Sequence, residues 1–167
     1  MNRFPIVEIS LLVLAVLGLT ACATTRPFAD DLLQSVSSDL TPVQAARNGE
    51  QGATVFWGGV IVSASNRQEY TDLVVLAYPL NSSQRPQQNK PPLGRFIARY
   101  PGYLETVVYS AGRELTVLGP LQGIETGTVG NAAYRYPVVK AEKMYLWSDK
   151  DDSKVHFGVG VGIGVRL

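Results

Sequence analysis

The alternation of apolar runs and turn residues dominates the chain from Thr54 onward. Five apolar runs have the length of strands, and they cover residues 54–64, 70–78, 94–100, 114–124 and 136–147. Short strands separated by clusters of glycine, proline and asparagine are typical of a small sandwich or barrel. The pattern therefore predicts an all-β domain with small α content.

Glycine and proline inside two of the runs predict where the sheet bends. Gly58 and Gly59 lie at the centre of the first run and indicate a bulge or a sharp coil. Gly119 and Pro120 interrupt the fourth run. Because proline donates no ladder hydrogen bond, this strand is expected to bend or to lie at an edge. Both features suit strands that curve round a barrel.

One short helix is predicted before the first strand. Thr41 and Gln44 have the spacing of a capping box with a proline between them, and Gly49 suits the C-terminal cap, which predicts a helix at about residues 42–48. A helical turn is expected around residues 104–109, between the third and fourth strands. Five strands with a coiled first strand and such a connector predict a five-stranded OB-like barrel.

An uncharged apolar segment precedes this domain. Residues 9–21 carry no charge over thirteen positions. A membrane-spanning helix needs about 20 apolar residues, so the segment is too short to span and suits the apolar part of a secretory signal. We predict a cleaved signal peptide over residues 1–21.

The only cysteine of the chain follows this segment directly. A single cysteine forms no internal disulfide, so Cys22 needs another reason for its position. The residues Leu19, Thr20, Ala21 and Cys22 resemble the lipobox of bacterial lipoproteins; the alternative is a small apolar cysteine in a membrane or core helix. The resemblance implies that Cys22 carries an S-diacylglycerol and an N-palmitoyl group. Three acyl chains would then anchor the protein firmly to a membrane.

The residues after Cys22 indicate a location and a tether. Residue 23 is alanine and not the aspartate that retains many such lipoproteins in the inner membrane. We therefore expect a lipid-anchored protein in the outer membrane, facing the periplasm. Residues 22–38 are mixed and rich in small polar side chains, and we interpret them as a lipidated tether to a barrel domain at residues 39–147.

The C-terminal unit, residues 148–167, ends in the most regular pattern of the chain. Residues 155–167 alternate between apolar side chains and His156, four glycines or Arg166, which predicts a strand. Three interpretations are open for this segment. It completes the domain's own sheet or stays a tail; it pairs at its edge with a second copy or with an envelope protein; or it contacts the membrane as part of a closed barrel. We hypothesise self or partner association through it.

The charge balance argues against one class of partner. Fifteen lysines and arginines oppose fourteen aspartates and glutamates, for a formal net charge of +1, and no basic block occurs. Proteins that bind nucleic acid neutralise its phosphates with clustered positive charge. Nucleic acid is therefore not an expected partner.

Few residues suit catalysis or metal binding. His156 is the only histidine, so no catalytic residue is assigned and an envelope hydrolase is disfavoured. Asp149, Asp151 and Asp152 lack the glycine and the distal glutamate of a calcium loop, and we interpret them as solvated linker. The glycine spacing at residues 158–164 does not match a phosphate-binding loop. We predict a non-enzymatic protein with no cofactor and no metal.

One face of the barrel is a candidate ligand site. OB barrels often bind oligonucleotides or oligosaccharides on one face. An aromatic and basic platform there would consist of Trp57, Tyr70, Tyr78, Arg95 and Arg99. The competing interpretation is that the aromatic rings fill the core and the arginines solvate the surface.

Five segments of the predicted strands are distinctive as a group: FWGGVI, VVLAYPL, GRFIARYPGYLE, GRELTVLGPLQG and YRYPVVKAEKMYLW. Together they resemble the Slp family, the starvation-inducible outer-membrane lipoproteins of Gram-negative bacteria. The resemblance covers the lipobox and about residues 38–147, and it implies location and fold, not an activity. We expect an envelope structural or interaction module that acts in stress or starvation. The alternative is an OB-like protein that binds an envelope glycan or small ligand.

Overall fold

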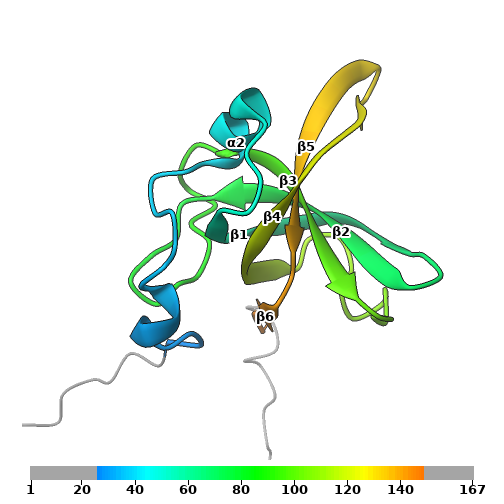
Figure 1. The fold of residues 1–167 in the computed structure, drawn as a ribbon. Coiled ribbons are helices and arrows are strands. Elements are labelled where there is room, and N and C mark those ends of the chain that lie inside the picture. The colour runs from blue at the N-terminus through cyan, green and yellow to red at the C-terminus, as the bar shows by residue number, and fades with distance from the viewer. Residues whose placement is uncertain (1–25, 149–167) are drawn as a thin grey trace, which may run out of the picture.

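The computed structural model describes residues 26–148 (Figure 1). Its elements are η1 (Asp30–Leu33), α2 (Pro42–Asn48), β1 (Thr54–Asn66), β2 (Tyr70–Tyr78), β3 (Gly94–Pro101), β4 (Glu114–Val129), β5 (Ala132–Lys140) and β6 (Lys143–Leu146). The lipobox, the signal segment and the alternating segment 155–167 lie outside the described residues.

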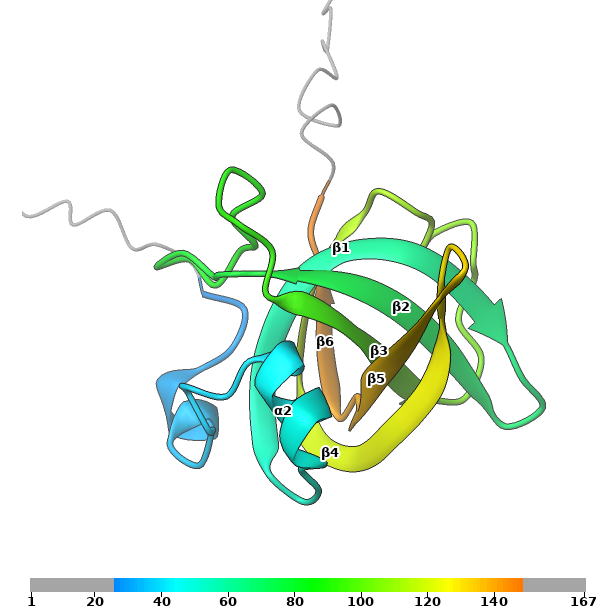
Figure 2. The ribbon, with the colours of Figure 1, turned by 90° about the horizontal axis from the view of Figure 1, so that it is seen from above.

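Five strands form a closed ring (Figure 2). Their order is β1-β2-β3-β5-β4, and β4 pairs back to β1. All pairings in the ring are antiparallel except that of β3 with β5, which run parallel where Ile97 faces Val138 and Arg99 faces Lys140. A five-stranded ring with this connectivity is the topology of an OB barrel. The predicted all-β, five-stranded OB-like barrel is confirmed.

The glycine pair of β1 lets two strands approach one backbone. Gly58 and Gly59 pair with β2 on one side and with β4 on the other. A Cβ added to Gly59 would lie 2.0 Å from the carbonyl oxygen of Leu76. The bulge expected at these glycines lies elsewhere, because the register of β1 against β2 shifts between Ile61 and Ser63. The glycines serve close packing, and the bulge arises from an unpaired extra residue after them.

The bend predicted at Pro120 is where β4 changes its partner. β4 pairs with β1 as far as Pro120 and with β5 from Leu121 onward. Proline has no N–H to donate, so it is tolerated at the point where the pairing changes. A Cβ on Gly119 would lie 1.9 Å from the carbonyl oxygen of Lys140, which shows how closely the strands approach at this bend.

The expected fourth and fifth strands differ most from the observed ones. The fourth strand continues to Val129, because it forms a hairpin with β5 that leaves only Gly130 and Asn131 as the turn. The run expected as the fifth strand divides into β5 and β6. The chain bends between them, where the N–H of Ala141 donates to the carbonyl of Arg99 on β3. β6 then pairs with β4.

The predicted helix forms with the predicted caps. The side-chain oxygen of Thr41 accepts from the N–H of Gln44, the side chain of Gln44 accepts from the N–H of Thr41, and Gly49 adopts the left-handed conformation at φ 71°. α2 packs against β3 and β5 at one end of the barrel. Between β3 and β4 the turn expected around residues 104–109 forms, with the N–H groups of Val108 and Tyr109 donating to the carbonyl of Glu105, and a second turn follows where the N–H of Arg113 donates to the carbonyl of Ser110. The helix at the end of the barrel is α2, which precedes β1.

Apolar side chains fill the inside of the ring, and a smaller group lies outside it. The inner cluster includes Val55, Trp57, Ile61, Leu73, Val75, Phe96, Ala98, Leu115, Val117 and Val139. The outer cluster is formed by Ile97, Tyr136 and Val138. Phe96 and Ile97 are adjacent and belong to different clusters, as the two-residue period of a strand requires.

Candidate functional site

The five residues expected to form one ligand face lie in three separate places. Trp57 lies inside the ring, where its indole N–H donates to the carbonyl of Leu40 at 2.7 Å and its ring packs edge-on against Phe96. Tyr78 lines a cavity described below. Arg95 uses its backbone N–H to donate to the Tyr134 hydroxyl. Two pairs therefore come together: Trp57 with Tyr78 at the lining of the cavity, and Tyr70 with Arg99 on the wall of the ring.

The Arg99 cluster joins three strands on the wall of the ring. The guanidinium of Arg99 donates to both carboxylate oxygens of Asp72 at 2.8 and 2.9 Å, and pairs with Glu125 at 2.9 Å. It also lies 4.2 Å from the centre of the Tyr70 ring. The hydrogen bonds to Asp72 raise the pKa of Arg99 above its ordinary value. Since these contacts engage the whole guanidinium fork, the cluster holds β2, β3 and β4 together.

Part of the segment expected as a tether is attached to the barrel. Residues 26–38 are described, and Phe28 among them is only 3% exposed. The N–H of Phe28 donates to Gln84 Oε1 at 2.9 Å, and Gln84 Nε2 donates to the carbonyl of Phe28 at 2.8 Å. The Phe28 ring packs edge-on against Phe56 of β1. The entering chain is therefore fastened through its backbone and its side chain.

Hydrogen bonds continue from Gln84 to the place where the described chain ends. The hydroxyl of Thr116 donates to the carbonyl of Gln84 at 2.9 Å, and the indole N–H of Trp147 donates to the same hydroxyl at 2.9 Å. Phe28, Gln84, Thr116, Trp147 and Ser148 thus form one region, which we call the exit end. Both ends of the described chain meet at it.

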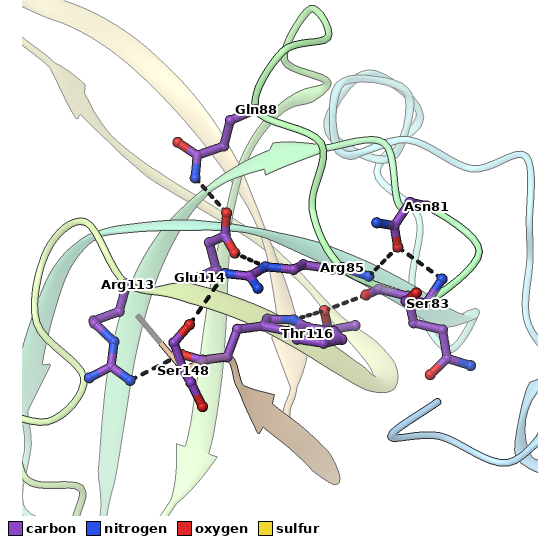
Figure 3. Close-up of polar contacts among 10 residues, drawn as sticks. Asn81, Ser83, Arg85, Gln88, Arg113, Glu114, Thr116 and Ser148 are labelled. Carbon is purple, nitrogen blue, oxygen red and sulfur yellow. Dashed lines mark hydrogen bonds and ion pairs between the residues drawn. The ribbon is translucent and has the colours of Figure 1, made fainter. Parts of the chain in front are cut away.

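Two arginines hold the exit end on the C-terminal side (Figure 3). Arg85 pairs with the carboxylate of Glu114, which also accepts from Gln88 Nε2 at 2.6 Å. Arg85 further donates to the carbonyl of Ser148 at 3.2 Å, and Arg113 donates to the carbonyl of Trp147 at 3.0 Å. The side chain of Glu114 is only 7% exposed, so its burial requires these partners.

An apolar cavity of about 430 Å³ adjoins the exit end. One wall is the segment from η1 to the start of α2, and the other is formed by β1, β2 and the loop that follows β2. Its lining residues are Leu33, Val36, Ser38, Leu40, Thr41, Pro42, Phe56, Trp57, Ala77, Tyr78, Pro79, Leu80, Asn81, Gln84 and Leu93. No charged side chain is among these described residues.

Polar groups elsewhere in the described part have structural partners. The two buried carboxylates there, Asp72 and Glu114, are each paired with an arginine.

Within residues 26–148 no three histidine, cysteine or acidic side chains gather as metal ligands would. In the same range no helix has the length and apolar character required to cross a bilayer. His156 and the aspartates 149, 151 and 152 lie outside the described residues.

Gln84 and Thr116 were not predicted as site residues. Gln84 lies in a polar, proline-rich loop, and its φ of 69° is the only positive φ of a non-glycine residue in the described chain. The sequence signal near it is Asn81, whose side-chain oxygen accepts from the N–H groups of Ser83 and Arg85 as asparagine commonly does in turns. That signal predicts a turn and says nothing of the contact with Phe28.

Comparison with known proteins connects this chain to envelope lipoproteins. The family model described as "Outer membrane lipoprotein Slp family" matches residues 19–160, beginning at the first residue of the predicted lipobox. The chain is 30% identical over 131 residues to the "Uncharacterized lipoprotein YeaY" of Escherichia coli (strain K12), covering 78% of this chain and 67% of that one. It is 38% identical over 96 residues to an "Uncharacterized protein" of Haemophilus influenzae, covering 57% of this chain and 52% of that one.

Among solved structures, the chain is similar to a small single-stranded DNA-binding protein from Streptomyces coelicolor. The TM-score is 0.39 at 12% sequence identity, and the match covers 62% of this chain and 99% of that one.

Proposed function

The chain belongs to the Slp family of outer membrane lipoproteins, and from this premise we propose that it is a non-enzymatic interaction module held to the outer membrane by lipid on Cys22. The family places the chain at the outer membrane. The proposal adds the anchor residue, an orientation toward the periplasm, and a role in envelope integrity under stress or starvation.

The anchor is supported by the sequence around Cys22. An apolar segment ends in Leu19-Thr20-Ala21-Cys22, and cleavage before Cys22 would remove residues 1–21. A single myristoyl chain binds membranes only marginally, so the diacylglycerol and the palmitoyl group together would make attachment effectively permanent. Alanine at position 23 supports sorting to the outer membrane.

The exit end is the observation that carries the proposed role. The entering and leaving segments are fastened to one network through Gln84 and Thr116, and η1 and β6 lie on the same side of the barrel in Figure 1. A pull on the lipidated end, or a change in its position, would therefore be transmitted through this network to the start of the C-terminal unit. We propose that residues 155–167, presented from this side, associate with a second copy or an envelope protein.

The anchor is tested by Cys22→Ser in the native host. The substitution should abolish incorporation of labelled palmitate and leave the precursor uncleaved, as read by gel mobility and mass spectrometry. Ala23→Ser serves as a matched control that should keep both labelling and cleavage. Palmitate labelling that persists in Cys22→Ser would contradict the assignment of Cys22.

Association is tested by removing residues 153–167 from the lipidated protein. Crosslinking in envelopes should then lose the species formed by the intact chain, while palmitate labelling stays unchanged. An unchanged set of crosslinked species would overturn this part of the proposal and leave the anchor standing. A strain that lacks the protein should show increased envelope permeability in starvation medium if the role in stress is correct.

A further inference from the structure

The apolar cavity beside the exit end has the properties of a lipid site. We propose that it binds one acyl chain of a lipid that is not the protein's own anchor. The inference rests on the proposed membrane attachment only for the source of the ligand. The cavity itself is argued from its lining, its size and its position.

Four polar side chains of the lining are already engaged in hydrogen bonds within the protein. The indole N–H of Trp57 donates a hydrogen bond to the carbonyl of Leu40. The Gln84 amide forms two hydrogen bonds with the backbone of Phe28, and the Thr41 side chain is hydrogen-bonded to Gln44. The side-chain oxygen of Asn81 accepts from two backbone N–H groups. A glycan needs many hydrogen-bonding partners, and these groups are not available to supply them.

The lining of the cavity is uncharged and mostly apolar. The lining contains the aromatic rings of Phe56, Trp57 and Tyr78 together with aliphatic side chains, and none of the described lining residues is charged. A charged ligand would lose its hydration there without gaining an ion pair. A hydrocarbon chain has no charge hydration to lose on entering, and each methylene group removed from water adds affinity that offsets the ordering of the chain.

The size of the cavity suits one acyl chain. The cavity volume is about 430 Å³, within the usual range of small-molecule sites. If each methylene group takes about the volume of a liquid water molecule, ~30 Å³, the cavity accommodates on the order of a dozen of them. That is most of one acyl chain and too little for the several chains of a whole membrane lipid.

The cavity lies next to the segment that leads to the proposed anchor. Gln84 and Phe56 both line the cavity, and both contact Phe28, which lies six residues after Cys22. Six extended residues span roughly 21 Å, so a barrel anchored at Cys22 keeps the cavity close to the bilayer. A lipid of that bilayer is therefore the nearest source of an acyl chain.

Binding is measured with the full-length protein in phosphatidylcholine nanodiscs, using 12-doxylstearate as a quencher of tryptophan fluorescence. The chain has two tryptophans, so Trp147→Phe leaves Trp57 in the cavity as the reporter, and Trp57→Phe leaves Trp147 outside it. Quenching of Trp57 should be saturable and reversed by palmitate. Quenching of Trp147 should rise linearly with the probe. Equal, unsaturable quenching of both tryptophans would overturn the proposal.

The lining is tested with a matched pair of substitutions in the Trp147→Phe background. Leu32 and Leu33 are neighbours in η1 and are both half-buried, but only Leu33 lines the cavity. Leu33→Glu should weaken probe binding at least tenfold, while Leu32→Glu should change it less than twofold. An equal effect of both substitutions would overturn the assignment of the cavity, because it would reflect η1 and not the lining.

The source of the chain is tested by comparing the acylated protein with Cys22→Ser, each in nanodiscs. Equal affinity for 12-doxylstearate supports binding of an external lipid. Binding in Cys22→Ser but not in the acylated protein would show that the protein's own anchor fills the cavity and would overturn the proposal. Palmitate labelling of Cys22 is measured in parallel, so failure of the lipid site and failure of the anchor are distinguished.

Discussion

The wall of the ring and the exit end both contain a buried arginine–carboxylate pair, and the pairs serve different purposes. Arg99 and Asp72 lie opposite each other on adjacent strands that backbone pairing already joins. Arg85 and Glu114 link a loop to a strand, and Arg85 continues to the backbone of Ser148. The first pair reinforces a sheet. The second pair acts together with Gln84 and Thr116. These residues fix the segment around Phe28 and the end of the described chain after β6, which lie outside the paired strands.

This difference predicts how substitutions act. Changes in the ring should lower the global free energy of unfolding, because closure of the barrel depends on every strand. Changes at the exit end should release a segment while the ring stays folded, since local opening costs less than global unfolding.

The largest effect is expected for Gly59→Ala in the ring. The added Cβ would lie 2.0 Å from the carbonyl oxygen of Leu76, so the backbone of β1 or β2 must move. Overpacking of this kind costs about 3 kcal/mol, the upper part of its usual range. The loss in the free energy of unfolding is measured by urea denaturation. Val62→Ala is the control, because Val62 lies on the same strand and is more exposed, and it should cost about 0.5 kcal/mol or less. Equal midpoints for the two variants would contradict close strand approach at Gly59.

A smaller global effect is expected for Arg99→Ala. The substitution leaves the carboxylate of Asp72, whose side chain is 10% exposed, without its bidentate partner. Because the Arg99 side chain is itself 20% exposed, the cost should be about 2 kcal/mol, below that of a fully buried pair. Arg95→Ala on the same strand is the control, since its described hydrogen bond uses only the backbone N–H. If both variants unfold at the same urea concentration, the cluster does not reinforce the wall.

The ring could be predicted from the sequence because the features that determine it, apolar runs and the turn residues between them, are local and periodic along the chain. Apolar runs with turn residues between them located β1, β2, β3 and the start of β4, and the capping residues Thr41 and Gln44 located α2. The extension of β4 to Val129 was missed because residues 127–129 contain glycine and threonine, which resemble a loop in sequence. Their strand state depends on pairing with β5.

The exit end could not be predicted, because its contacts join residues far apart in the chain. Phe28 and Gln84 are 56 positions apart, and Thr116 and Trp147 are 31 apart. No period or motif marks such a pair. The five residues of the predicted ligand face are divided among separate places for a related reason: aromatic residues indicate burial and binding equally well in sequence, and Trp57 packs in the core cluster.

The smallest global effect, and the sharpest test of the comparison, is expected for Gln84→Ala. The substitution removes both hydrogen bonds to the backbone of Phe28 and keeps the same positive φ at position 84. The free energy that holds the Phe28 segment should fall locally by about 1 kcal/mol, while the global free energy of unfolding should hardly change, because the freed groups of Phe28 regain hydrogen bonds with water when the segment opens. Hydrogen exchange at the Phe28 amide should accelerate about tenfold for each ~1.4 kcal/mol lost locally, while exchange in β1 to β5 stays unchanged. Gln68→Ala in the exposed turn after β1 should alter neither. Uniform acceleration through the ring would mean that the exit end and the barrel open together, and the separation of the two regions would fail.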